Sequence, residues 1–418
     1  MANTLLTSSV ILKEVYAIMH QKGNFLMNTN RQYDNRFANR EMQIGQSLDL
    51  RMPPKYTTRD GNTMSQQNIV QRAVALPLAT IKGVDLNITQ EQMTFKIEDL
   101  STQVLQPAVT QLTASVEGDV LTGVLKKVAN YSGSVTTSVN YASYQNTGRF
   151  LQESLAPANQ RTFIMNPQTR VDFSDAVKGL FQSSSNIEKQ YVDGMVGRTG
   201  GFNVFENTLL PSFTPGTFNG TLSTTVSTTA DGGYDGTGNA YTSSFGLKFD
   251  VTTSYAFNEG DIITIANVFD VQPETKAVYG TLKKFTVAAA TSGTTTGTLT
   301  ITPAPILSGA YQNVNTAIAD NAQILVLGST SGAGTAGRTV YGQNLGFQKD
   351  AIAFVTADLI DPSQFGAWGT REVFDNISLR IWRQGDIING TFPCRLDIAY
   401  GYCLPYPEWA ARCVHTLA

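Results

Sequence analysis

The alternation of apolar and polar positions divides the chain into segments of different predicted structure. Between residues 107 and 129 apolar side chains recur every three or four positions, the spacing of one face of an α-helix. The stripe consists of Val109, Leu112, Val116, Val120, Val124 and Val128. Pro107 suits the first helical turn, where its missing N–H leaves no bond unmade. The pattern predicts one long helix of about 35 Å, at 1.5 Å per residue, which we call the spine helix.

Two segments before the spine helix have weaker patterns. Near the N-terminus one helical face carries Leu6, Val10, Ile11, Val15, Ile18 and Met19, which predicts an amphipathic arm packed on its own domain or on a neighbour. Residues 46–80 alternate weakly around the turn sequence Asp60-Gly61-Asn62 and predict a long two-stranded excursion. Its apolar content is too thin for a core, so it must lie on its own body or on an adjacent molecule.

The pattern changes twice after the spine helix. Residues 161–167 read as a strand and residues 171–181 as a helix, and such mixing predicts an α/β or α+β layer. From about 212 to 335 Gly, Ser and Thr dominate, and short strands recur at spacings typical of a barrel or sandwich. These strands are expected at 245–252, 262–268, 280–287 and 297–301. Because mixed character returns from residue 342, we expect the β segment to be a domain inserted into a discontinuous host.

Composition and charge limit the function. The 418 residues allow two or three domains, and only 15% are charged, which favours a protein that buries surface against its own copies, although a monomer with a Ser/Thr-covered surface gives the same count. The net charge of -3 and the pI of about 5.5 argue against sequence-specific DNA binding, for which a basic domain is expected. The charge is uneven, because residues 1–85 are rich in Lys and Arg and residues 207–337 in Asp and Glu.

The sequence offers little for catalysis. His20 and His415 are the two histidines, at opposite ends of the chain, and motifs for a hydrolase nucleophile, a zinc protease helix or a phosphate loop are missing. We therefore predict no enzyme, no metal and no cofactor. The Gly-rich stretch at 328–337 lacks the phosphate-loop lysine and is predicted to be a flexible linker. Asp231 and Asp235 lack calcium-loop spacing, which favours an exposed mobile loop.

The location of folding follows from cysteines and apolar runs. Cys394, Cys403 and Cys413 match neither a zinc site nor a redox pair, so we expect free, buried thiols and folding in a reducing cytosol. The chain has no run of 18 apolar residues and its first 25 residues do not have the order of a signal peptide. We expect synthesis in the cytoplasm and no membrane partner.

The order of these elements resembles the major capsid (coat) proteins of tailed double-stranded-DNA bacteriophages, particularly the short-tailed Salmonella-phage-like group with an inserted β-barrel domain. The resemblance rests on TFKIEDLSTQVLQPAVTQL, GLKFDVTTSYAFNEGDIITIANV, LTITPAPI with AYQNVNTAIAD, LGFQKDAIAFVTADL and RLDIAYG, in this order. It spans nearly the whole chain, which departs from the better-known member of the group in having more Gly and Thr across the insertion.

The resemblance implies an α+β protein with the Hong Kong ninety-seven-type phage capsid fold and an inserted all-β barrel domain. The implied segments are the N-terminal arm (1–42), the extended β loop (43–82), the peripheral domain (83–149) with spine helix 107–129, the axial domain (150–211 and 338–375), the inserted β-barrel domain (212–337), and the peripheral strands with the C-terminal tail (376–418). By the same resemblance the chain is a structural major capsid protein that self-assembles into the icosahedral shell enclosing packaged double-stranded DNA, with procapsid-to-capsid maturation.

The implied partners are other copies of the chain in hexamers and pentamers, a scaffolding protein, a portal protein, and packaged double-stranded DNA bound without sequence specificity. The implied location is the virion capsid, after assembly in the host bacterial cytoplasm. A β-rich virion decoration protein or adhesin-like binding protein is the alternative, suggested by the Ser/Thr/Gly-rich middle. The amphipathic arm, the spine helix and the mixed flanks argue against it, and a hydrolase would need a nucleophile and base that the sequence lacks.

Two segments are predicted to contact neighbouring subunits. The extended loop carries Arg51, Lys55, Arg59 and Arg72 around a thin apolar strip, and we expect it to lie on the adjacent subunit; an ordinary exposed hairpin is the alternative. The polar segment 229–244 carries Asp231, Tyr234 and Asp235. In the family the corresponding loop reaches the inserted domain of an adjacent capsomer, so the resemblance implies that role here.

Overall fold

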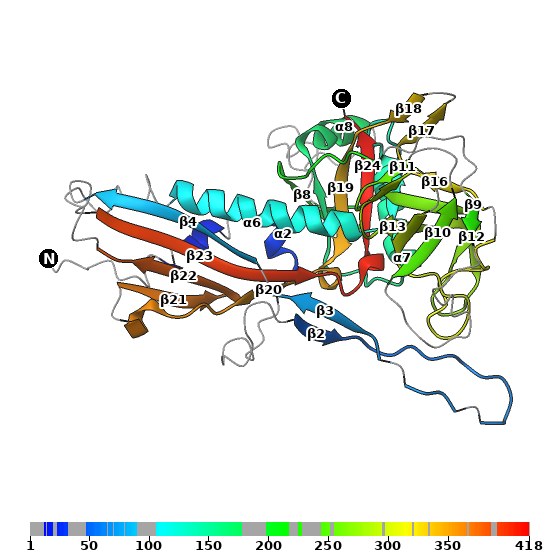
Figure 1. Cartoon of the computed structure of the whole chain (residues 1–418), viewed down its shortest axis with the longest axis horizontal. Coiled ribbons are helices and arrows are strands. Elements are labelled where there is room, and N and C mark those ends of the chain that lie inside the picture. Colours follow the sequence, from blue (N-terminus) through cyan, green and yellow to red (C-terminus); the bar gives the residue numbers. More distant parts are fainter. Residues whose placement is uncertain are drawn as a thin grey trace, which may run out of the picture. The chain divides into compact units, whose positions relative to one another are not determined.

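The computed structural model of the chain (Figure 1) describes most of its residues. They are residues 12–13, 15–19, 23–31, 47–64, 66–69, 71–78, 80–89, 106–177, 198–216, 225–227, 244–250, 255–294, 297–319, 322–332, 335–365, 368–385 and 391–417. Each of two compact units is built from separate stretches of chain. Unit 1 comprises Met1–Leu50, Val74–Leu121 and Ile352–Pro405, and unit 2 comprises Arg51–Ala73, Thr122–Ala351 and Tyr406–Ala418.

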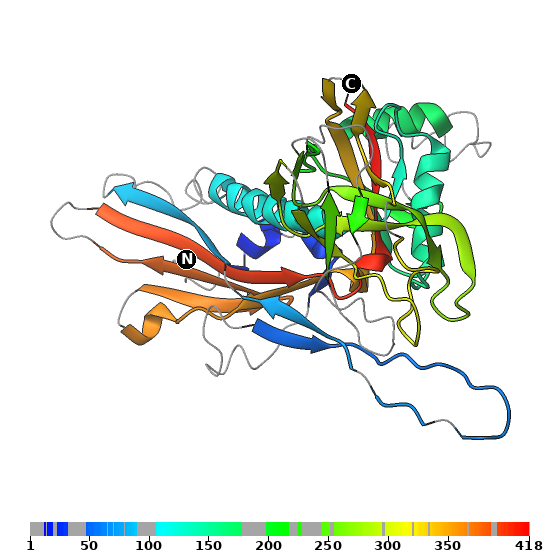
Figure 2. The same cartoon turned by 45° about the vertical axis from the view of Figure 1, so that its right-hand side comes forward.

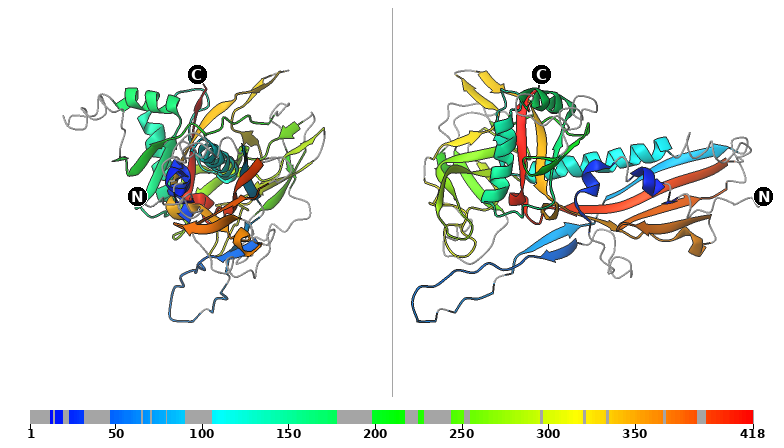
Figure 3. Two further views of the ribbon diagram at one scale, coloured as in Figure 1. Left: turned by 90° about the vertical axis from the view of Figure 1, so that its left-hand side faces the viewer. Right: turned by 180° about the vertical axis from the view of Figure 1, so that it is seen from behind.

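Unit 1 contains a six-stranded sheet with the order β1-β20-β23-β22-β21, in which β4 also pairs with β23. Its elements are α2 (Asn24–Met27), β1 (Asn30–Arg31), β4 (Thr80–Thr89), β20 (Ala353–Ala357), η3 (Pro362–Phe365), β21 (Trp368–Phe374), β22 (Ile377–Arg383) and β23 (Thr391–Cys403). Figures 1 and 3 show β4, β23, β22 and β21 side by side. In strand β22 the apolar residues Ile377, Leu379 and Ile381 are buried on one face, and the small Ser378 on the other face is buried as well.

The spine helix is confirmed as α6 (Gln106–Lys127). All six apolar stripe residues are buried. Lys126 and Lys127 in the last turn complement the partial negative charge at the helix end. Within unit 1 the buried carboxylate of Glu117 accepts the backbone N–H of Phe25 at 2.7 Å, and Asp119 accepts the Tyr400 hydroxyl at 2.5 Å. These two bonds attach α6 to α2 and to the sheet.

The host part of unit 2 is a second six-stranded sheet, ordered β5-β24-β19-β6-β8-β7. Its elements are β5 (Tyr131–Gly133), α7 (Tyr141–Glu153), β6 (Arg161–Met165), α8 (Pro167–Val177), β7 (Arg198–Thr199), β8 (Phe202–Glu206), β19 (Tyr341–Gln348), η2 (Lys349–Ala351), η4 (Pro407–Trp409) and β24 (Ala410–Thr416). Tyr144 of α7 lies among the rings of Phe163, Phe173 and Phe202 in the core between helix and sheet.

Two sequence predictions in this part need correction. The helix predicted at 171–181 begins at Pro167, because Asn166 caps it and proline fits its first turn. The strand predicted to reach residue 167 therefore ends at Met165. Helix α7 was not predicted.

The β segment of unit 2 forms a sheet ordered β16-β12-β13-β15-β10-β9. The strands are β9 (Thr225–Ser227), β10 (Phe245–Asp250), β12 (Ile262–Val271), β13 (Val278–Val287), β15 (Gly297–Thr302) and β16 (Ile324–Val326), with a smaller pair, β11 (Tyr255–Phe257) and β14 (Thr291–Gly293). The four predicted strands are confirmed with shifted ends. Their inward side chains, which include Phe249 and Phe285, share one core with Phe257 of β11. Closure into a barrel and the domain boundaries stay predictions.

The Gly-rich stretch at 328–337 is not simply a linker. Strands β17 (Ser329–Gly332) and β18 (Thr335–Arg338) pair there as an antiparallel hairpin, from Ser329↔Arg338 to Gly332↔Thr335. The prediction of a flexible linker was wrong because the two halves of this stretch, with two residues between them, pair with each other as strands.

The predicted two-stranded excursion is confirmed. β2 (Ser47–Arg51) pairs with β3 (Ala73–Pro77), and Figures 2 and 3 show the chain between them as one long excursion. We call residues 51–72, which include the last residue of β2, the extended loop. Met52 N–H donates to the Arg72 carbonyl at 2.8 Å where the loop leaves the strands, and Gly61 turns the tip with a φ of 85°.

Candidate functional site

The extended loop exposes both charge and apolar surface. Arg51 is exposed at the end of β2. Arg59 is also exposed, and its guanidinium donates to the carbonyls of Gly61 and Thr63 within its own turn. Three large apolar side chains of the loop are exposed as well, Tyr56 at 60%, Met64 at 75% and Ile69 at 71%. A loop of this kind offers another molecule both apolar contact area and positive charge.

The other two loop cations differ from each other in exposure. The side chain of Arg72 is only 10% exposed, and its Nη1 lies 3.8 Å from the Glu408 carboxylate. Lys55 is exposed, and its backbone N–H donates to the Tyr311 hydroxyl at 3.4 Å. The four predicted contact residues are therefore not equivalent. Arg51, Lys55 and Arg59 are exposed, whereas Arg72 is largely covered. Asp231, Tyr234 and Asp235 lie outside the described residues.

Within unit 2 the inserted domain meets the end of the spine helix at a buried junction, which we call the clasp: residues 258–261 with Lys126 and Arg412. Arg412 of β24 is fully buried. Its Nε donates to the Val128 carbonyl at 2.8 Å, its Nη2 to the Gly260 carbonyl at 3.0 Å and its Nη1 to Gln343 Oε1 at 3.2 Å. One guanidinium thus joins the chain after the spine helix, the inserted domain and β19.

The turn of the inserted domain fits closely against the spine helix. Gly260 has a φ of 92°, and a Cβ added to it would lie 3.0 Å from the Lys126 Cα. Next to it Lys126 Nζ pairs with the Glu259 carboxylate at 2.9 Å. Only glycine allows both the positive φ and the close contact with Lys126. The glycine of the Asn-Glu-Gly-Asp turn therefore also lets the inserted domain pack against the spine helix.

A buried carboxylate completes the clasp. Asp261 is fully buried and accepts the backbone N–H of Asn258 at 2.7 Å and that of Gly216 at 3.2 Å. Burial raises the pKa of Asp261 to about 6, although these bonds and the charge of Arg412 act in the opposite direction. Burial also lowers the pKa of Arg412 to about 10. Both buried charges are stabilised by hydrogen bonds. The guanidinium of Arg412 donates to carbonyl and amide oxygens, and the carboxylate of Asp261 accepts from backbone N–H groups.

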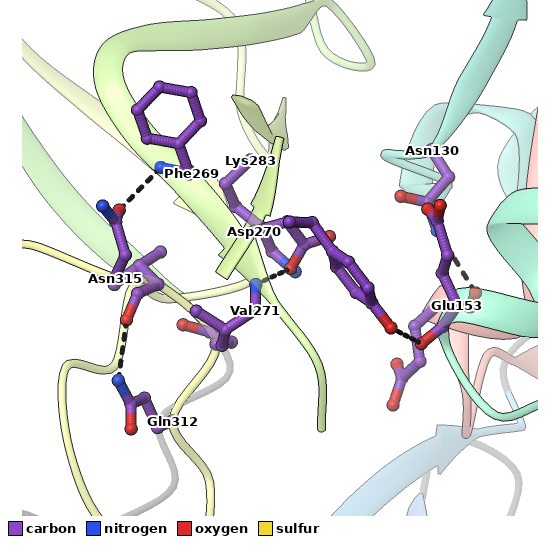
Figure 4. Close-up of polar contacts among 12 residues, drawn as sticks. Asn130, Glu153, Phe269, Asp270, Val271, Lys283, Gln312 and Asn315 are labelled. Carbon is purple, nitrogen blue, oxygen red and sulfur yellow. Dashed lines mark hydrogen bonds and ion pairs between the residues drawn. The ribbon is translucent and has the colours of Figure 1, made fainter. Parts of the chain in front are cut away.

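A second contact between the inserted domain and the host lies at α7 (Figure 4). Lys284 of β13 donates to the Tyr131 carbonyl at 2.7 Å, and its Nζ lies 3.3 Å from the centre of the Phe150 ring. The Tyr279 hydroxyl donates to the Glu153 carbonyl at 3.3 Å, close to the ion pair of Lys283 with Asp270 at 2.9 Å. Burial lowers the pKa of Lys284 to about 7, and the nearby Arg149 acts in the same direction.

An open, polar cleft of about 530 Å³ lies between α7 and the inserted domain, lined by residues such as Gln145, Arg149 and Gln272. Among the described residues, no group of three or more His, Cys, Asp or Glu could hold a metal ion. The three cysteines are buried and free, as predicted. Of the helices in the described ranges, none is long and apolar enough to cross a membrane.

Comparison with known families decides the identity. A family model described as P22 coat protein, gene protein 5, matches residues 2–412. The chain belongs to the P22 coat protein family. Together with the order of elements described above, this membership confirms the predicted phage capsid fold and makes the chain a major capsid protein that forms the icosahedral shell of a bacteriophage. It also sets aside the alternative of a decoration or adhesin-like protein.

Solved structures similar to this coat protein share little of its sequence. A structure from Mycobacterium phage Che8 has 10% identity and a TM-score of 0.43, with 93% of this chain and 90% of that chain covered. The capsid of Cyanophage P-SCSP1u has 10% identity and a TM-score of 0.43, covering 90% and 85%. The capsid of a native GTA particle has 8% identity and a TM-score of 0.44, covering 95% and 91%. No curated protein matches the sequence.

Sequence reasoning missed the clasp. The turn at residues 258–261 was recognised, but Arg412 was not selected, because its oxygen partners come from residues distant in the chain. The one available signal was the unusual run Ala-Ala-Arg-Cys-Val at 410–414, a charge inside an otherwise apolar strand. An arginine that is buried in such a strand must have its charge paired or hydrogen-bonded.

Proposed function

We propose that this coat protein assembles through its extended loop, which lies on the neighbouring subunit and contributes Arg51 and Arg59 at the contact. The observation that supports this is the combination of exposed apolar side chains and exposed guanidinium groups on one long segment. Lys55 and Arg72 stay proposed contacts nearer the base of the loop, where Lys55 N–H donates to Tyr311 and Arg72 pairs with Glu408. The subunits form hexamers and pentamers, and the family role as a structural protein carries no enzymatic activity.

The experiment is an assembly assay on a variant with the apolar surface removed. Tyr56→Ser, Met64→Ser and Ile69→Ser together should leave the subunit folded and abolish closed shells seen by electron microscopy. A matched control is Val171→Ser, which removes a side chain that is 58% exposed on α8 rather than on the loop. Normal shells from the triple variant would sink the proposed role of the loop.

A second intersubunit contact is proposed for the segment 229–244. Asp231 and Asp235, with Tyr234 between them, would pair with Lys or Arg on the inserted domain of an adjacent capsomer. Each such pair contributes about 0 to 1 kcal/mol, but the contact repeats over the shell. Asp231→Ala with Asp235→Ala should give malformed or less stable shells, more so at high salt, where the remaining pairs are screened. Closed shells of normal size and stability at both salts would show that the segment is solvated surface.

Assembly would begin in the host bacterial cytoplasm with a scaffolding protein and a portal protein, and the shell would mature as DNA is packaged. The net charge of -3 supports a container that holds double-stranded DNA without sequence specificity, since a strongly basic lining would retain DNA in a salt-dependent way. The inserted domain stabilises its host through the clasp. Its deletion should therefore give insoluble or misassembled coat protein.

A further inference from the structure

A buried polar network lies where β24 meets the start of α8. The imidazole of His415 is 1% exposed, and its Nδ1 lies 2.7 Å from the Thr416 carbonyl. A carbonyl oxygen only accepts, so Nδ1 carries the proton of the ring. The other nitrogen, Nε2, lies 3.3 Å from Nδ2 of Asn166. The neutral ring therefore accepts a hydrogen bond from the Asn166 amide.

The orientation of Asn166 is fixed by the helix that it caps. Its Oδ1 accepts the backbone N–H of Thr169 at 2.7 Å, which is the N-cap bond of α8. Asn344 of β19 holds both neighbours, because its Oδ1 accepts Asn166 N–H at 2.9 Å and its Nδ2 donates to Thr169 Oγ1 at 3.0 Å. With its oxygen used by the cap, Asn166 presents its NH₂ group to His415.

The ring packs directly on the backbone of β19. Gly342 of β19 is paired with His415, and a Cβ added to it would lie 2.3 Å from the ring atoms Cε1 and Nε2. Burial lowers the pKa of His415, while the bond to Thr416 and the charge of Asp172 on α8 act against this shift. Asp172 is the charged group that α8 brings to the ring, and the partner strand β19 brings Gly342 beside it.

We propose that His415 is a proton-sensitive lock on the N-terminus of α8. The neutral ring accepts from Asn166 and keeps the amide in its capping orientation. Protonation places an Nε2–H donor against the NH₂ donor, so Asn166 either loses the ring or rotates by 180° and abandons the buried Thr169 N–H. Mild acid thus opens the first turn of α8 in the subunit. This inference goes beyond the proposed assembly function and does not depend on it.

The direction of the pH effect follows from proton binding. The locally opened state binds a proton on His415 more readily than the closed state does, so the closed state loses stability as pH falls below the ordinary histidine pKa of about 6.5. Loss of an N-cap of this kind corresponds to a population of open helix ends that is roughly tenfold larger. Above that pH range the lock is fully closed.

The test uses full-length protein and two readouts. With two histidines in the chain, imidazole NMR signals are assigned by His415→Gln and by the control His20→Gln. Hydrogen–deuterium exchange of the peptide spanning residues 166–172, corrected for intrinsic pH dependence, reports opening of α8. We expect His415 to titrate below the ordinary histidine range and exchange to rise roughly tenfold between pH 7.5 and 5. His415→Gln should remove this rise, whereas His20→Gln should keep it.

Asn166→Asp separates the lock from a merely structural role. A carboxylate can accept from Thr169 N–H and from a protonated Nε2–H together, so the pKa of His415 should rise above its wild-type value and acid should no longer open α8. Asn166→Ala should open α8 equally at every pH. The proposal is overturned if wild-type exchange does not change as His415 titrates, or if Asn166→Asp leaves the pKa of His415 unchanged.

Discussion

The clasp and the extended loop use the same residue types in opposite ways. Arg412 is fully buried and donates to three oxygens from three segments, whereas Arg59 is exposed and donates only within its own turn. Gly260 and Gly61 both have a positive φ, yet a Cβ on Gly260 would meet Lys126 and a Cβ on Gly61 would meet nothing within 4 Å. Burial rather than residue type decides which region stabilises the subunit and which is available to another molecule.

The largest expected effect is on the buried guanidinium of the clasp. Arg412→Met removes three hydrogen bonds and leaves the Val128 and Gly260 carbonyls in a dry site, so we expect the free energy of unfolding to fall by about 3 to 5 kcal/mol. Urea unfolding measures it. The control Arg149→Met removes a side chain that is 47% exposed and should change the same quantity by about 0 to 1 kcal/mol. Equal effects of the two changes would mean that burial does not decide how much an arginine stabilises the subunit.

The two regions also differ in how far the sequence predicts them. The spine helix and the inserted strands follow from local periodicity, because each buries one continuous apolar face. Helix α7 escaped prediction since its buried face includes Thr147 beside Tyr144, Phe150 and Leu151, although Asn140 supplies a capping side chain. A regular pattern in one element is visible from sequence, and a mixed polar face is not.

The partners within the clasp could not be predicted in the same way. Arg412 reaches Val128 and Gly260, which lie far away in the sequence, and only the folded sheet brings them together. The same holds for the loop cations. Sequence alone treated Arg51, Lys55, Arg59 and Arg72 as one set, but packing separates Arg72, beside Glu408, from the two exposed arginines.

Adding one methyl group to Gly260 in the clasp or to Gly61 in the extended loop should destabilise the protein to different degrees. Gly260→Ala combines backbone strain with a contact at 3.0 Å to the spine helix, and we expect a loss of about 2 to 3 kcal/mol in unfolding free energy. Gly61→Ala carries only the strain, in an exposed turn that can relax, and should cost about 1 kcal/mol or less. Thermal unfolding of both variants is the measurement. A Gly61→Ala protein as unstable as Gly260→Ala would mean that contact with the helix does not matter.

Lys284, at the contact between the inserted domain and α7, should make the stability of the protein depend on pH to an intermediate extent. Burial holds the pKa of Lys284 at about 7 in the folded protein, against an ordinary value near 10.4. The unfolded chain therefore binds more protons between these values, and stability should rise as pH increases from about 7 to 9. Lys284→Met should flatten this rise in urea unfolding. Arg51→Gln in the exposed loop should preserve it, and a slope that survives Lys284→Met would assign the effect to another group.

Charge reversal at Arg51 and Arg59 in the extended loop should have the smallest effect on stability but a large effect on assembly. Arg51→Glu with Arg59→Glu changes two exposed charges, so the free energy of unfolding should stay within about 0.5 kcal/mol of the wild-type value. If the loop lies on the neighbouring subunit, the two glutamates would be repelled by the surface that binds the arginines. Shells should then fail to form. Circular dichroism with urea unfolding and electron microscopy of the same preparation measure the two quantities. Arg51→Lys with Arg59→Lys keeps the charge and should assemble. Normal shells from the glutamate variant would leave the loop as an ordinary exposed hairpin.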